Sequence, residues 1–406
     1  MRILKILALT ILVVAVAFAS WYYRPWSKYS PAKVAGLQKN ESLVKNFRSM
    51  SELIPSKTVE TSSGAAPLAY QLESLELSYD FDGQRKSLDQ FIEESTTTGL
   101  LVIKDGTIRF EDYYQGANEK SLFTSWSMAK SFVATGIAIA VKEGKIESLD
   151  DQAQKYASQF AGSAFGESSL RSLIAMSTGV EFDENYASDE GDIRPFFFNS
   201  FILGKNPDTL LLPFERSRPA FNDFHYISPN SHVLSAVLRG VYQKPLAQIM
   251  SEKIWQPLGM EAQANWQQHR DDENGIALGY CCLNARLRDY ARFGKFYLEA
   301  YKSEGLGTEL LPEGWANQMT DPATKAHAPS GKGSIVNAYS GRGYSQHFWL
   351  PIDEPGVFFA AGVYGQFIWI DTNRNLVIAR NSADAEWTPR YPESEAVMKA
   401  IARHYD

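Results

Sequence analysis

The sequence predicts an α+β fold in which an antiparallel β-sheet is flanked by helices and carries an inserted all-helical lobe. Patterns typical of strands occur near residue 100 and again from about residue 347 to 380. Between them, residues from about 150 to 330 show mostly helix and loop patterns. Strand patterns on both sides of a helical block indicate one sheet built from both parts of the chain. The length of 406 residues and the 44% hydrophobic content suit one large domain with such a lobe.

Residues 1–23 are predicted to be a signal peptide or a membrane anchor. Two basic residues precede an uncharged run from residue 6 to residue 23. The tripeptide Ala17-Phe18-Ala19 offers a cleavage site, whereas the tryptophans and tyrosines that follow are typical of a membrane interface and favour retention. Either alternative exports the rest of the chain, to the periplasm or cell envelope of a bacterial host. A retained segment 6–23 would anchor the protein in the inner membrane.

Residues 24–86 are polar and mixed, and we expect a linker and an N-terminal extension there. The sheet should begin with a β-hairpin of residues 100–103 and 107–110 around a Gly-containing turn. Helices are expected at 127–144, 170–176, 230–242 and 286–301. Later strands are expected at 347–350, 357–360, 366–370 and 376–380, before a closing helix at 392–403.

The composition argues against several classes of partner. A net charge of −7 leaves no basic footprint for nucleic acid. The scattered histidines and the two cysteines have no zinc spacing, so neither a metal nor a cofactor is expected. Cys281 and Cys282 are adjacent, and because neighbouring cysteines rarely bridge, we expect two small buried hydrophobic residues and no disulfide. No pattern indicates the oligomeric state.

Ser127 and Lys130 are the strongest catalytic candidates. They lie three positions apart at the front of the apolar run 132–141, which predicts a buried helix. On one helix face the lysine amine can contact the serine hydroxyl, and a neutral amine can accept its proton. The free N–H groups of a first helical turn also favour negative charge. The alternative is a helix-capping serine beside a solvated lysine.

The Ser-x-x-Lys spacing is not specific alone, because Ser42 and Lys45 repeat it in a polar stretch, where we interpret it as chance. A Ser-His-Asp triad is a second route, with His225 as its base. A Ser/Lys site is often completed by a tyrosine instead. Tyr226 precedes a predicted buried helix and could shuttle a proton from a cleft. Its alternative is a buried tyrosine with a satisfied hydroxyl.

Residues 359–366 combine two alanines and two glycines in a predicted strand. Small residues there allow a ligand or another backbone to approach closely. Such a strand could donate a backbone N–H to an oxyanion, and the Ser127 N–H could be the second donor. The alternative is a packing constraint between helix and strand.

Several stretches in order resemble the serine β-lactamase-like superfamily, and most closely its class C-related branch of 6-aminohexanoate-dimer hydrolases and β-lactamase-fold esterases. These stretches are Ser127-Met128-Ala129-Lys130-Ser131-Phe132, Tyr226-Ile227-Ser228 and Ala361-Gly362-Val363-Tyr364-Gly365-Gln366, with support from residues 173–180, 257–260 and 287–294. The resemblance covers about residues 90 to 400. It implies that residues 87–406 form a serine hydrolase domain, with the site between sheet and lobe.

The resemblance also implies roles for individual residues. Ser127 would be the nucleophile that forms an acyl-enzyme, Lys130 its activating base or hydrogen-bond partner, and Tyr226 the proton shuttle. The backbone N–H groups of Ser127 and Val363 would form the oxyanion hole. Substrate contacts would come from Tyr186, Ser228, Gly362 and Tyr364.

Two departures from the family pattern narrow the range of expected substrates. Ala360 stands where β-lactamases and penicillin-binding proteins carry lysine or histidine, so the cation that holds a substrate carboxylate is missing unless Arg342 supplies one. Ser228 replaces the asparagine of the Tyr-x-Asn pattern. We therefore expect an exported serine hydrolase that acts on a small-molecule ester or amide. A β-lactamase or D-alanyl-D-alanine carboxypeptidase is the alternative enzyme, and a non-catalytic membrane-tethered binding protein is the alternative from another class.

Overall fold

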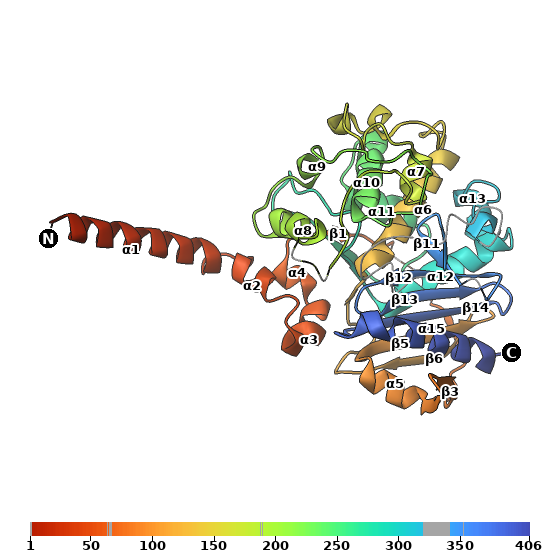
Figure 1. Cartoon of the computed structure of the whole chain (residues 1–406). Helices are drawn as coiled ribbons and strands as arrows, with labels where there is room; N and C mark the ends of the chain where they lie inside the picture. The colour runs from red at the N-terminus through yellow and green to blue at the C-terminus, as the bar shows by residue number, and fades with distance from the viewer. Residues whose placement is uncertain are drawn as a thin grey trace.

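The computed structural model describes residues 2–62, 64, 67–186, 188, 190–319, 342–351 and 353–406. A large sheet covered by helices forms the body, a lobe lies at one end, and the helix α1 (Arg2–Tyr23) projects away from both (Figure 1). The predicted α+β class is therefore confirmed.

The described residues form an 8-stranded sheet in the order β10-β11-β12-β13-β14-β5-β6-β2. Its strands are β2 (Ala69–Tyr70), β5 (Thr97–Lys104), β6 (Thr107–Tyr113), β10 (Gly343–Ser345), β11 (Phe348–Leu350), β12 (Val357–Gly362), β13 (Gln366–Asp371) and β14 (Leu376–Ser382). Neighbouring strands pair antiparallel, except β2, which runs parallel to β6. Strands β5 and β14 pair directly, so both parts of the chain build one sheet, as predicted.

The remaining described elements fall into three groups along the chain. The first group is α2 (Pro31–Ala35), η1 (Asn40–Ser42), α3 (Leu43–Arg48), α4 (Met50–Leu53), β1 (Ser56–Val59), β3 (Ser78–Phe81), β4 (Gln84–Ser87) and α5 (Leu88–Glu94). The second group is β7 (Phe123–Thr124), η2 (Trp126–Met128), α6 (Ala129–Lys142), η3 (Ala153–Lys155), η4 (Ser158–Phe160), α7 (Leu170–Ile174), α8 (Ile193–Phe201), α9 (Pro207–Leu210), α10 (Ser228–Tyr242), α11 (Leu246–Met250), η5 (Ser251–Trp255), β8 (Ala264–Gln267) and β9 (Leu283–Ala285). The third group is α12 (Leu287–Tyr301), α13 (Gly305–Leu310), η6 (Asn317–Met319) and α15 (Trp387–His404).

Helices cover both faces of the large sheet. The ring of Phe367 in β13 lies 5.4 Å from that of Tyr391 in α15. On the opposite face, α12 approaches so closely that a Cβ on Gly294 would lie 2.5 Å from the side chain of Val377. Successive strand residues point to opposite faces, and both faces are covered, so strands β12, β13 and β14 are buried along their whole length.

The lobe differs from the expectation of an all-helical insertion. Strands β8 and β9 lie within it and join β1 and β7 in a 4-stranded sheet, in the order β1-β8-β9-β7. The prediction missed these strands because each is too short to show a reliable period. The expected lobe also included residues 320–330, which lie outside the described residues.

The segment after α1 packs against the body, and the expectation of a linker is wrong for residues 31–59. Leu37 and Phe47 are buried, and Ile54 is fully covered. Strand β1 then pairs antiparallel with β8. The apolar residues of this segment sit on helices of only a few residues, so no helical period stands out in the sequence. The segment is an extension that becomes part of the fold.

Candidate active site

Ser127 lies in the turn η2, immediately before the buried helix α6. We expected Ser127 in the first turn of this α-helix. The structure places it in a 3-10 turn that directly precedes the helix. Trp126 has a φ of 43°, which non-glycine residues seldom adopt. Its neighbour Ser127 is half-buried and lines a cavity, whereas the surrounding residues of the turn are buried. The turn thus presents one hydroxyl to the cavity.

Lys130 is fully buried and donates hydrogen bonds to three oxygen atoms. Its Nζ donates to Ser127 Oγ at 2.9 Å, to Ser228 Oγ at 3.1 Å and to the carbonyl of Tyr280 at 3.0 Å. Burial lowers the pKa of Lys130 to about 8, against the opposing influence of Glu184. An amine with such a pKa is partly neutral near neutral pH, and a neutral amine can take the proton of the adjacent hydroxyl. The structure therefore brings the predicted Ser/Lys pair into direct contact.

Glu184 is a buried carboxylate that the sequence prediction missed. It accepts hydrogen bonds from Ser228 N at 2.9 Å, from Ser228 Oγ at 2.5 Å and from the hydroxyl of Tyr186 at 2.8 Å. Burial raises the pKa of Glu184, and the nearby Lys130 opposes that shift. The only signal in the sequence was its position two residues before Tyr186, in a loop without a recognisable period.

Tyr226 is buried beside the Ser/Lys pair. Its ring centroid lies 5.0 Å from Lys130 Nζ, and the ring of Trp349 in β11 stacks on it with the centroids 5.4 Å apart. Tyr226 precedes α10, whose first residue is Ser228, so one chain segment supplies both side chains. Lys130 Nζ therefore lies within cation–π range of the Tyr226 ring.

Gly362 of strand β12 packs against the turn that carries Ser127. A Cβ on Gly362 would lie 2.5 Å from the carbonyl oxygen of Ser125 and 3.1 Å from Ser127 N. Only glycine fits there without displacing the strand. The next residue, Val363, lines the same cavity as Ser127. The proposed oxyanion donors, Ser127 N and Val363 N, thus come from two segments in close contact.

A cavity of about 810 Å³ opens in front of Ser127. Tyr186 and Tyr364 both line it, whereas Ser228 and Gly362 lie behind the lining. The ring of Tyr364 lies 5.7 Å from that of Trp126 and 4.9 Å from that of Phe47. Of the four expected substrate contacts, only the two tyrosines therefore lie on the cavity surface. Ser228 instead contacts Lys130, and Gly362 packs against the turn of Ser127.

The competing candidates lie elsewhere. Ser42 donates to the carbonyl of Lys39 at 3.1 Å and accepts from Asn46 at 3.0 Å, so it is held in local structure. His225 Nδ1 lies 3.1 Å from an Arg218 nitrogen, away from the cavity lining. Arg342 pairs with Glu395 of α15 and is not in that lining. Among the described residues, no group of His, Cys, Asp and Glu is arranged to hold a metal ion.

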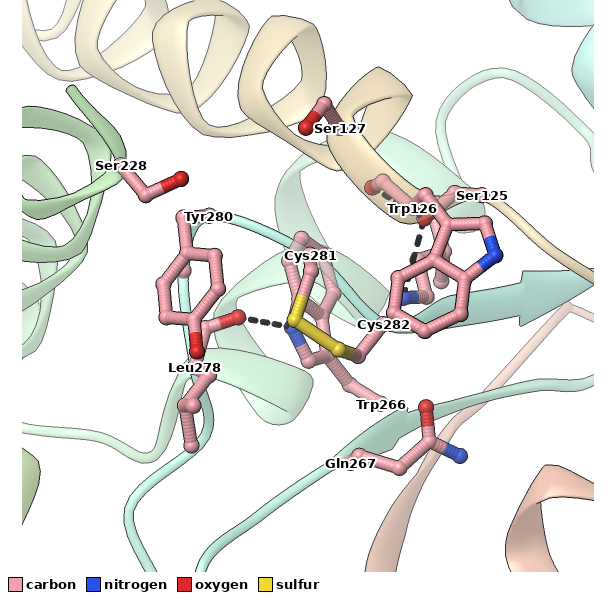
Figure 2. The surroundings of a disulfide bond; sticks show 12 residues. Ser125, Trp126, Ser127, Ser228, Trp266, Gln267, Leu278, Tyr280, Cys281 and Cys282 are labelled. Atoms are coloured by element: carbon pink, nitrogen blue, oxygen red, sulfur yellow. Dashed lines mark hydrogen bonds between the residues drawn. A yellow bond between two sulfur atoms is a disulfide. The ribbon is translucent and has the colours of Figure 1, made fainter. Parts of the chain in front are cut away.

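Cys281 and Cys282 form a disulfide, so the expectation of two unpaired cysteines is wrong. They lie between Tyr280 and the turn that carries Ser127 (Figure 2). On one side the Tyr280 carbonyl accepts from Lys130 at 3.0 Å. On the other side Ser125 N donates to the Leu283 carbonyl at 2.7 Å. Adjacent cysteines rarely bridge, and for that reason their spacing argued against a disulfide. In this structure the bridge occurs together with a left-handed backbone at Cys282, whose φ is 77°.

Comparisons with known proteins agree with this arrangement. The sequence profile of the family described as Beta-lactamase matches residues 87–403. The 6-aminohexanoate-dimer hydrolase of Paenarthrobacter ureafaciens is 22% identical over 344 residues, which cover 83% of this chain and 84% of that protein.

Solved structures share the fold. One from Bacillus anthracis, assigned as a 6-aminohexanoate-dimer hydrolase, has a TM-score of 0.78 at 23% identity and covers 94% of this chain and 97% of its own. EstCE1, described as a hydrolase with promiscuous acyltransferase activity, has a TM-score of 0.60 at 17% identity and covers 77% of this chain and 96% of its own.

Proposed function

The chain belongs to the Beta-lactamase family, and from this we propose that it is an exported serine hydrolase that cleaves an ester or amide through an acyl-enzyme on Ser127. The observation that carries the proposal is the 2.9 Å contact between Lys130 Nζ and Ser127 Oγ at the edge of a cavity. A buried amine with a lowered pKa is the base that a serine nucleophile needs.

The proposed reaction assigns one step to each of these groups. Neutral Lys130 accepts the Ser127 proton as Oγ bonds to the substrate carbonyl carbon. The N–H groups of Ser127 and Val363 stabilise the oxyanion. The bond to the leaving oxygen or nitrogen then breaks, and Tyr226 transfers the proton from Lys130 to the leaving group. Water finally attacks the acyl-enzyme by the reverse proton path and releases the acid and free Ser127.

Ester or amide substrates fit this site better than β-lactams. Ala360 and Ala361 are both buried apolar residues of β12, and neither can hold a substrate carboxylate. The relative from Paenarthrobacter ureafaciens is named as a hydrolase of the 6-aminohexanoate dimer, and EstCE1 is described as a hydrolase with promiscuous acyltransferase activity. Both names support acyl transfer on this fold.

Export is supported by two independent features. Helix α1 is long enough and apolar enough to cross a membrane, as a signal sequence or an anchor would. The disulfide between Cys281 and Cys282 fits an oxidising compartment, because cytosolic thiols are kept reduced.

The test compares the full chain with its Ser127→Ala variant on p-nitrophenyl acetate. We expect the variant to lose turnover to the background level. A second substitution, Ser42→Ala, removes the serine of the other Ser-x-x-Lys sequence and should leave turnover intact. Undiminished turnover by Ser127→Ala would refute the proposal.

A further inference from the structure

Two elements contribute apolar side chains to the wall of the cavity in front of Ser127, beside polar lining residues that include Gln38, Arg194 and Asn199. Val34 and Leu37 come from α2 and the turn after it, and Ile193, Phe197 and Ile202 come from α8 and the residue that follows it. A wall of this kind binds an apolar chain by removing it from water. The reacting carbonyl would lie at Ser127, and the rest of the acyl group would extend between α2 and α8.

The mouth of this cavity has both apolar and polar residues, because the exposed lining residues include Gln38, Asn40 and Arg194. Ala35, Pro195 and Phe198 line the cavity and are exposed to solvent, so they mark its opening. Phe198 is 46% exposed, and Leu203, two residues beyond the end of α8, is 39% exposed. Large apolar side chains at the rim of a cavity are typical of contact with lipid or with an apolar ligand.

The mouth also adjoins the base of α1. A second hollow is lined by Arg24, Tyr29 and Leu203, and it shares Val34 and Ile202 with the wall of the active-site cavity. Only residues 24–30 separate α1 from α2, and seven residues span at most about 25 Å. Figure 1 shows α1 leading directly into α2 beside α8.

Exposed aromatic residues surround the same junction. Tyr23, at the end of α1, is 64% exposed, and Trp26 is 72% exposed. Tryptophan and tyrosine at the end of a membrane-spanning helix lie at the level of the lipid headgroups. With α1 in a bilayer, the cavity mouth would therefore open close to the membrane surface.

The geometry points to a specific substrate class: membrane amphiphiles whose ester or amide carries a long acyl chain, which enters the cavity between α2 and α8 from the bilayer that α1 spans. This inference rests on the proposed function, because Ser127 must cleave the bond. It adds that α1 is retained as an anchor and that the acyl chain, more than the leaving group, gives the substrate its affinity.

The first experiment measures kcat/KM for p-nitrophenyl acetate, butyrate, octanoate and dodecanoate with the full chain in phosphatidylcholine vesicles. We expect kcat/KM to rise with chain length, by at most about fourfold per added methylene. A flat or falling series, in a protein that still cleaves the acetate through Ser127, would overturn the inference and leave the proposed function intact. If no ester is cleaved in a Ser127-dependent manner, the proposed function itself fails.

Variants at the mouth test the path of the chain. Ala35→Asp and Phe198→Asp place a charge at exposed positions of the rim, and each should lower the ratio of dodecanoate to acetate turnover at least tenfold. Phe221→Asp is the matched control, because Phe221 is 44% exposed but lies outside the lining. An unchanged ratio in both mouth variants, or an equal fall in the control, would contradict the path.

A last comparison tests entry from the bilayer. Dodecanoyl ester is supplied either dissolved below its aggregation limit or embedded in the same vesicles. Leu203→Asp should lower turnover of the embedded ester relative to the dissolved one. The inference would be overturned if the unaltered chain failed to hydrolyse the embedded ester. It would also be overturned if the protein were recovered without α1 in the soluble fraction of the cells that express it.

Discussion

Lys130 and Glu184, two buried side chains of opposite charge, are joined through one hydroxyl group. Ser228 Oγ accepts from Lys130 Nζ at 3.1 Å and donates to Glu184 Oε1 at 2.5 Å. Burial lowers the pKa of Lys130, and the Glu184 charge limits how far it falls. Burial and the Glu184 charge together therefore determine the fraction of Lys130 that is neutral at a given pH.

The first prediction concerns the pH dependence of catalysis. The neutral amine is the active form, and burial lowers the pKa of Lys130 to about 8. Below that pH, kcat/KM should therefore fall about tenfold per pH unit, and above it the profile should level off. The measurement is the pH profile of kcat/KM on p-nitrophenyl acetate. A profile that is flat from pH 6 to pH 9 would exclude Lys130 as the base.

The second prediction separates the Glu184 charge from the shape of the loop. In Glu184→Gln the negative charge that raises the pKa of Lys130 is lost, so the acid limb of the profile should move to lower pH. The free energy of unfolding should also fall by about 1–2 kcal/mol, because hydrogen bonds to a charged acceptor are weakened.

Glu190→Gln supplies the control for that variant, since Glu190 belongs to the same loop and is exposed. It should leave both the pH profile and the unfolding transition unchanged. An acid limb that stays in place in Glu184→Gln would show that the carboxylate does not act on Lys130.

The third prediction tests the contact between β12 and the Ser127 turn. In Gly362→Ala the new Cβ would lie 2.5 Å from the Ser125 carbonyl oxygen, so the strand must move away from the oxyanion site. We expect kcat to fall about 10²–10³-fold while the protein still folds. Gly36→Ala serves as control, because its Cβ meets the nearest atom at 3.5 Å. Equal kcat in both variants, measured beside circular dichroism, would count against the oxyanion hole.

The fourth prediction concerns the disulfide. Replacing both Cys281 and Cys282 by serine frees the segment between the Tyr280 carbonyl, which holds Lys130, and Leu283, which pairs with Ser125. Small displacements of catalytic groups are costly, and kcat should fall roughly 10–100-fold. Stability should change by only about 1 kcal/mol, because the bridge closes a very short loop.

A dithiol reductant should reproduce this loss in the unaltered protein and have no effect on the double variant. Intact mass should rise by the two hydrogens that reduction adds. Two free thiols in protein purified without reductant would contradict the structure.

Local spacing explains why part of the site could be predicted. Ser127 and Lys130 are three residues apart at the start of one helix, so their contact follows from helix geometry. The hairpin at Asp105 and Gly106 is equally local, and both residues have the positive φ that its turn requires.

Long-range packing explains what could not be predicted. Glu184 is one of 47 acidic residues, and nothing in its own loop shows that it is buried against Ser228, the first residue of α10. Val34 lies far from Ser127 in sequence, and only the folded chain places it in the wall of the same cavity. The disulfide was missed because the spacing of cysteines in sequence does not reveal the local backbone.

The most direct test of the central claim is to identify the residue that acts as the nucleophile. A fluorophosphonate probe, which reacts with activated serine hydroxyls, is added to the full chain, and the labelled peptide is located by mass spectrometry. We predict one adduct on Ser127, much slower labelling in Lys130→Met, and none in Ser127→Ala. Labelling of another serine, or undiminished labelling of Ser127→Ala, would contradict the account.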